Sequence, residues 1–96
     1  MARARLILHE KQVDEDGAVI EMKIWSVPAS SRHPYAVKYS LVYIRSGKRI
    51  LGYDNAHGQD HKHSARGSQQ YRFTNIRSLL RDFLREVERM KREEKQ

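Results

Sequence analysis

The sequence predicts an α+β fold, in which an antiparallel meander of four to five strands packs against one C-terminal α-helix. Two observations carry this prediction. Apolar and polar residues alternate through much of the first half of the chain, which is the period of a half-buried strand. Towards the C-terminus apolar residues recur at helical spacing instead. The chain has 96 residues, so residues 1–96 are expected to form a single domain.

The antiparallel sheet is expected within residues 3–53. Turn signals separate its strands: a Gly-containing acidic turn closes the first hairpin, and Ser46-Gly47 closes the second. The alternation is clearest after the loop between the two prolines, where Lys38 and Ser40 face away from the aromatic side. The expected strands are 3–13, 18–27, 35–45 and 48–53.

The second half is expected to hold a loop, a short strand and a helix. Residues 54–70 contain no aliphatic side chain larger than Ala, which predicts a long, polar, His-rich loop. Residues 71–73 form a short strand, and residues 75–91 an amphipathic helix capped by Thr74 or Asn75. Residues 92–96 are expected to fray. The apolar stripe of the helix consists of Ile76, Leu79, Leu80, Phe83, Leu84, Val87 and Met90.

The charge balance indicates a polyanionic partner. There are 19 Lys and Arg against 12 Asp and Glu, a formal net charge of +7. Such a field attracts phosphate backbones, anionic membranes or acidic proteins, although it also serves solubility alone. The chain has no cysteine, which excludes disulfides, thiolate metal sites and a Cys nucleophile. No signal peptide or membrane span is expected, so the predicted location is cytoplasmic, without membrane contact.

Three of the five histidines, His57, His61 and His63, fall within the polar loop. Imidazole titrates near neutral pH, so two of them could serve as base and acid when a ribose 2′-hydroxyl attacks its phosphate. Cationic side chains would hold the phosphate, and an aromatic ring would stack a base. The candidates for these binding roles are Lys62, Arg66, Arg72, Tyr53 and Tyr71.

Two other interpretations of the loop stay open at this point. His57, His61 and His63, with an Asp, could bind Zn or another divalent metal. Alternatively the histidines are simply solvated. The prediction retained is a site without a cofactor. The helix adds a ridge of Arg77, Arg81, Arg85 and Arg89, which is typical of an ordinary solvated face and would also suit a nucleic-acid interface.

Four blocks occur in order along the chain: GAVIEMKIWSVP at 17–28, HPYAVKY at 33–39, YDNAHGQDHKH at 53–63 and YRFT at 71–74. Together they resemble the TumE-type toxin family of prokaryotic toxin–antitoxin systems, over roughly residues 3–88. The resemblance implies a small toxin that forms a complex with an antitoxin protein. The residues carried over from the matching block are Asp54, Asn55, Asp60, His61 and His63.

The resemblance and the basic charge together favour RNA as the target. The function expected is a small metal-independent ribonuclease toxin, with His61 and His63 as acid and base and with Asp54 and Asn55 orienting them. One alternative is a non-catalytic module that binds nucleic acid or a partner protein through the arginines of the helix. Another is a metal-dependent phosphodiesterase that uses the same loop. A homodimer is expected, because a small sheet has edges that need cover.

Overall fold

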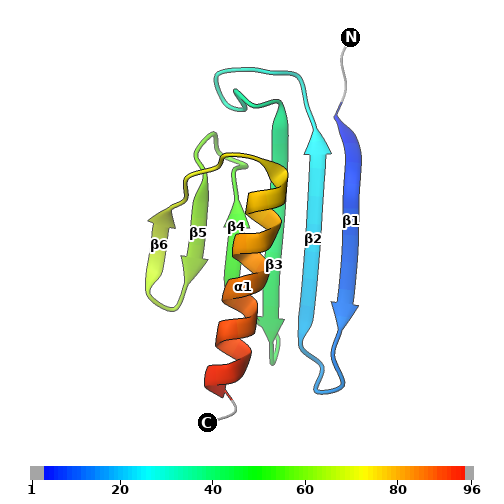
Figure 1. Ribbon diagram of the computed structural model, residues 1–96, viewed down its shortest axis with the longest axis vertical. Coiled ribbons are helices and arrows are strands. Elements are labelled where there is room, and N and C mark those ends of the chain that lie inside the picture. The colour runs from blue at the N-terminus through cyan, green and yellow to red at the C-terminus, as the bar shows by residue number, and fades with distance from the viewer. Residues whose placement is uncertain (1–3, 95–96) are drawn as a thin grey trace.

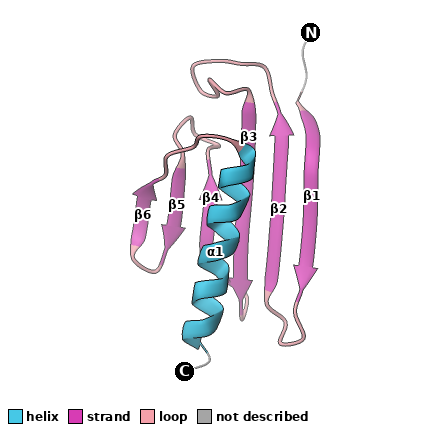
Figure 2. Ribbon diagram, in the orientation of Figure 1, coloured by secondary structure: helices cyan, strands magenta, loops and turns pink. Residues whose placement is uncertain are grey.

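The computed structural model describes residues 4–94 as a six-stranded antiparallel sheet with one helix against it (Figures 1 and 2). The order in the sheet, β1-β2-β3-β4-β5-β6, is the order in the chain. Each strand therefore pairs with its neighbour in sequence. The elements are β1 (Arg5–Val13), β2 (Val19–Ser26), β3 (Val37–Arg45), β4 (Lys48–Asp54), β5 (His61–Ser64), β6 (Gly67–Gln70) and α1 (Ile76–Glu94).

The α+β meander with a C-terminal helix is confirmed, but the expected number of strands is corrected from four or five to six. The extra strands, β5 and β6, lie in segment 54–70, which was expected to be a loop. Pairing in a sheet uses backbone groups, so a polar segment can extend the sheet wherever a free edge is available. Residues 71–73 are not a strand. The helix continues to Glu94, so residues 92–94 are helical, and 95–96 lie outside the described residues.

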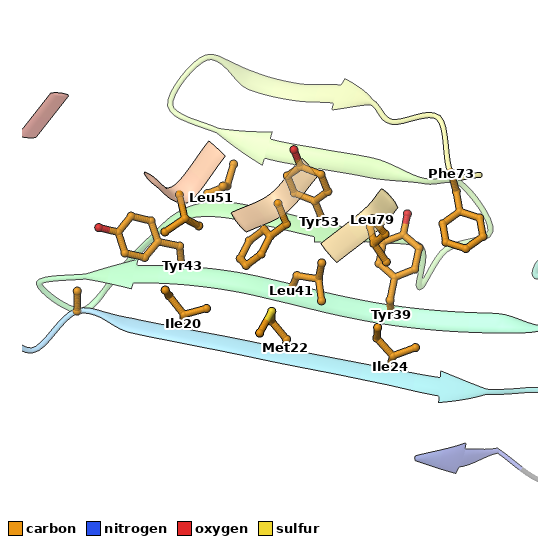
Figure 3. Packing of buried hydrophobic residues seen from close by; sticks show 13 residues of the cluster. Ile20, Met22, Ile24, Tyr39, Leu41, Tyr43, Leu51, Tyr53, Phe73 and Leu79 are labelled. Atoms are coloured by element: carbon orange, nitrogen blue, oxygen red, sulfur yellow. The ribbon is translucent and has the colours of Figure 1, made fainter. Parts of the chain in front are cut away.

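The hydrophobic core lies between α1 and one face of the sheet (Figure 3). Alternate residues of β2, β3 and β4 point to this face, and the helix supplies Leu79, Phe83 and Val87. Tyr39 and Tyr43 are fully buried there. The sheet residues of the core are Ala18, Ile20, Met22, Ile24, Tyr39, Leu41, Tyr43, Leu51 and Tyr53.

The helix is held in place at its start, middle and end. Asn75 caps it, as predicted, by accepting a hydrogen bond of 2.8 Å from the backbone N–H of Ser78. In the middle, the hydroxyl of Tyr53 donates to Glu86 Oε1 at 2.5 Å. At the end, Lys91 forms an ion pair of 2.8 Å with Asp14 in the β1–β2 turn. All these contacts lie on the helix side of the sheet.

Candidate functional site

The sheet face opposite α1 carries the other half of each strand's side chains, and we call it the open face. On β3 these residues alternate with the core tyrosines, so Lys38 and Ser40 point to the open face while Tyr39 points to the helix. A depression of about 510 Å³ crosses β2 to β5 on this face. Its side chains come from strands and from the loop after β4: Trp25, Lys38, Ser40, Arg49, Asp54, Ala56, His57 and His63, with Tyr39 beneath them.

An Asp–His pair forms one wall of the depression. Asp54 Oδ2 lies 3.2 Å from His63 Nε2. His63 is paired with Gly52 in the β4–β5 ladder and Asp54 with His61, so the contact runs diagonally between rows of the open face. The side chain of His63 is 31% exposed and that of Asp54 is 23% exposed. The carboxylate can therefore orient the imidazole, while the other ring nitrogen is left for a substrate.

His61 stands beside His63 on the same face, two residues earlier in β5. Their ring centroids are 5.9 Å apart. His61 Nε2 lies 3.1 Å from Gln59 Oε1, whereas its Nδ1 is buried without a hydrogen-bond partner among the described residues. His57 is exposed at the rim of the depression. The structure thus brings two of the predicted histidines together and leaves the third on the edge.

Two cations that the sequence analysis did not single out as site residues line the depression. Arg49 lies over Gly52: a Cβ built on that glycine would meet Arg49 Cδ at 3.2 Å and Nε at 3.4 Å. The missing side chain of Gly52 gives Arg49 room next to His63, the ladder partner of this glycine. Lys38 lies on the neighbouring strand β3 and places its Nζ 5.4 Å from the ring centroid of Trp25. Both cations are available to an anion in the depression.

Asn55 and Asp60 face the interior of the protein. Asn55 is 7% exposed. Its side chain accepts a hydrogen bond from the N–H of Tyr39 and donates one to the carbonyl of Val37. Asp60 Oδ1 accepts a hydrogen bond of 2.5 Å from the hydroxyl of Tyr39. Burial, and then this carboxylate, raise the pKa of Tyr39 well above its usual range. Both residues hold the segment that carries Asp54 and the histidines.

The predicted RNA-binding side chains lie away from the open face. Lys62 points to the helix side, where its Nζ is 3.4 Å from Glu86 Oε1. Tyr53 is buried, with its hydroxyl bonded to the same carboxylate. Tyr71 donates a hydrogen bond of 2.7 Å to Asp82. Arg66 lies at the exposed β5–β6 turn, and Arg72 near the start of the helix. Contact of these residues with RNA stays a prediction.

No cluster of three His, Cys, Asp or Glu side chains suited to hold a metal ion occurs within residues 4–94. The predicted ligands His57, His61 and His63 are divided between the rim of the depression and β5. The nearest partners of the two strand histidines are Gln59 and Asp54. What the depression offers is an imidazole–carboxylate pair with cations beside it. Such a set of groups is suited to move protons at a phosphate.

Comparison with models of protein families shows to which family this chain belongs. A family model described as "Toxin TumE" matches residues 3–91. The chain belongs to this family. The resemblance of the four blocks is therefore confirmed, and membership of the Toxin TumE family implies an antitoxin as partner. No curated protein and no solved structure matches the chain. In the described part of this TumE-family toxin, no helix is both long and apolar enough to cross a membrane.

Proposed function

We propose that this TumE-family toxin is a metal-independent endoribonuclease whose site is the depression on the open face. The observation that carries the proposal is the pair of His63 and Asp54, 3.2 Å apart, in a depression that Lys38 and Arg49 also line. A general acid or base, a group that orients it and cations for a phosphate are the parts required for cleavage by the ribose 2′-hydroxyl.

In the proposed reaction the 2′-oxygen attacks the adjacent phosphorus while a base removes its proton. The bond from phosphorus to the 5′-oxygen breaks, and an acid protonates that leaving oxygen. The products are a 2′,3′-cyclic phosphate and a 5′-hydroxyl. His63 is the acid, because the carboxylate of Asp54, 3.2 Å from its Nε2, holds the imidazole in a fixed orientation. His61 is the base, through the Nε2 that faces the half-exposed side of the site beside Gln59, because its ring centroid is 5.9 Å from that of His63 on the same face. Arg49, which lies over the ladder partner of His63, stabilises the charge on the phosphorane.

The test is cleavage of cellular RNA by the purified toxin, with and without a chelator. Cleavage that survives the chelator, with cyclic phosphate at the new 3′ ends, is the expected result. His63→Ala is expected to reduce the rate by at least roughly 10²-fold. Cleavage that stops with the chelator would support a metal-dependent phosphodiesterase instead. RNA binding without product would support the non-catalytic alternative.

A second comparison assigns the base. His61→Ala is expected to lose activity as His63→Ala does, while His57→Ala, at the exposed rim, retains most of it. All three variants need the same melting temperature as the wild type for this comparison. If His57→Ala loses activity and His61→Ala does not, the base is His57. That outcome has a structural basis, because His57 lines the depression together with His63.

We also propose that two copies of the toxin associate through β1. This strand is an edge of the sheet, so its outer backbone groups are free to pair with a second strand. It exposes three large apolar side chains: Leu6, Ile7 and Val13 are 52%, 49% and 63% exposed. Sedimentation should show a dimer that Ile7→Lys converts to monomer. A wild-type monomer at all concentrations tested would contradict the proposal.

The cytoplasmic location expected from the sequence belongs to the same proposal, because a ribonuclease toxin must reach cellular RNA. Fractionation of cells that express an inactive His63→Ala variant tests it. The variant is expected with the soluble fraction, and recovery with membranes would contradict the location.

A further inference from the structure

We propose that Trp25 and Lys38 form a subsite for an unpaired nucleobase and its phosphate, which makes single-stranded RNA the substrate class of this toxin. The inference rests on the proposed function, because it assigns the opposite end of the same depression. The ring of Trp25 would stack on the base, and the ammonium of Lys38 would hold the phosphate beside it.

Trp25 and Lys38 form a structural unit on the open face. They are directly paired in the β2–β3 ladder, and Lys38 Nζ is 5.4 Å from the centroid of the indole ring. Lys38 forms no ion pair with an acidic side chain in the part of the chain that the structure describes. Its positive charge is therefore available to a ligand, and the cation–π contact keeps it next to the ring.

The hydrophobic core does not require Trp25 at this position. The core of β2 is formed by Ala18, Ile20, Met22 and Ile24, which face the helix. Trp25 points to the opposite side, where no layer of the protein covers the sheet (Figure 1). The ring of Trp25 is half-buried in this polar depression, and a base would stack on the part of it that Lys38 leaves uncovered. Stacking on such a ring is how proteins hold bases of single-stranded nucleic acids.

The strand pairing places this subsite across the sheet from the proposed reaction centre and further along the strands. Strands β3 and β4 separate β2 from β5. Three strand spacings amount to roughly 14 Å between Trp25 and His63 across the strands, and the four residues of β3 between the row of Trp25 and the row of His63 add roughly 13 Å along them. The base on Trp25 therefore belongs to a nucleotide a few linkages away from the one that is cleaved. Lys38 and Arg49 lie on the strands between these ends, where the connecting backbone would run.

This geometry discriminates against a duplex. Bases in an RNA helix are stacked on each other and cannot offer a face to a protein ring. A single strand can turn one base onto Trp25 while its backbone crosses the cations. Because every base has a π-face, the subsite is expected to select unpaired RNA with little preference for sequence.

The inference can be tested by binding, independently of cleavage. Trp25 is the single tryptophan of the chain, so its fluorescence reports the subsite directly. In the His63→Ala variant, a single-stranded oligoribonucleotide is expected to quench this fluorescence, and the same sequence in a duplex is expected not to. Equal quenching by strand and duplex would overturn the inference.

Substitution of the ring provides the second measurement, by fluorescence anisotropy of a labelled oligoribonucleotide in the His63→Ala background. Trp25→Leu is expected to weaken binding of the single strand by about tenfold, whereas Trp25→Phe retains most of the affinity. Tyr35→Leu is the matched control, because Tyr35 is an aromatic residue that is 61% exposed outside the depression. Unchanged affinity in Trp25→Leu would contradict the stacking role.

The outcomes separate this inference from the proposed function. If the wild type binds single strands through Trp25 but produces no cleavage, the subsite stands and the nuclease proposal fails. If the wild type cleaves RNA, and Trp25→Leu cleaves single strands at the wild-type rate and with the wild-type preference over duplex, the nuclease stands and the subsite fails.

Discussion

The side chain of Asn55 is bonded to the backbone at Tyr39: its Oδ1 accepts a hydrogen bond of 2.9 Å from the N–H of that residue. Its Nδ2 donates a second bond, of 2.8 Å, to the carbonyl of Val37. Beyond the end of β4, the side-chain amide thus takes the place of a neighbouring strand and satisfies the backbone hydrogen bonds of β3. These two bonds give Asn55 the geometry of a structural bridge, and the catalytic role expected for it from the sequence stays a prediction.

Asn55→Ala is therefore expected to destabilise the protein. The change leaves a backbone N–H and a carbonyl without partners at a buried position, which costs about 2 kcal/mol or more in the free energy of unfolding. Urea denaturation measures the effect. The exposed Gln69→Ala serves as the control, with an expected change within about 0.5 kcal/mol. Equal stability of the two variants would contradict a bridging role.

Two carboxylates of the same segment are expected to behave differently. Asp54→Asn is expected to lower RNA cleavage by roughly 10²-fold while the melting temperature stays unchanged, because the amide no longer fixes the orientation of the His63 imidazole as the carboxylate does. Asp60→Ala is expected to lower the melting temperature, since the buried hydroxyl of Tyr39 loses its acceptor. Cleavage and thermal unfolding of both variants give the comparison. Full activity in Asp54→Asn would remove this aspartate from the site.

Gly52→Ala tests the placement of Arg49. The added Cβ would lie 3.2 Å from Arg49 Cδ, so the guanidinium must move away from its position near His63. Cleavage is expected to fall several-fold, whereas stability is unchanged or higher by about 0.5 kcal/mol, because Ala favours a strand more than Gly does. In an Arg49→Ala background the glycine substitution should have little further effect on cleavage. Additive losses would show that Gly52 acts through another group.

Alkaline pH is expected to weaken the docking of the helix. Burial, and then the hydrogen bonds to Glu86 and Asp82, raise the pKa values of Tyr53 and Tyr71 in the folded protein. In the unfolded chain these hydroxyls titrate near pH 10. Because the folded pKa is the higher one, their contribution is complete below about pH 10 and is lost as pH rises further.

The measurement is urea denaturation at a series of alkaline pH values. In Tyr53→Phe the decline of stability above about pH 10 is expected to be shallower, by at most about 1.4 kcal/mol per pH unit. Arg49→Ala is a suitable control, because it changes the open face without touching these hydroxyls. The same slope in Tyr53→Phe and the wild type would contradict the role assigned to this hydroxyl.

The elements that the sequence predicts well are those whose side chains report burial. Tyr39, Leu41 and Tyr43 alternate with polar neighbours, and the helix repeats its apolar residues at Leu79 and Phe83. Both patterns follow from one buried face. β5 and β6 carry no such pattern, because all their residues are half-buried or exposed. These strands pair through backbone hydrogen bonds, and the types of their residues do not indicate that pairing.

The site is predictable only in part for a related reason. Asp54 and His63 belong to one sequence block, and the β4–β5 ladder brings them into contact. Trp25 and Arg49 come from other strands and enter the site through the strand order. The alternation of side chains along each strand could have indicated them, since Trp25 points away from the face of β2 that forms the core. Tyr53 and Tyr71 are the opposite case. Their residue type suits contact with RNA, but in the structure their hydroxyls are hydrogen-bonded to side chains of the helix.

The agreement between strand order and chain order has a consequence for synthesis of the toxin. Each hairpin can form soon after the ribosome releases its two strands, because no strand waits for a distant partner. The helix is made after all six strands. Until it emerges, the aromatic and aliphatic face of the sheet meets water, and the nascent protein is at its most prone to aggregation. A halt in translation just before α1 would therefore yield an aggregation-prone sheet in place of a folded toxin.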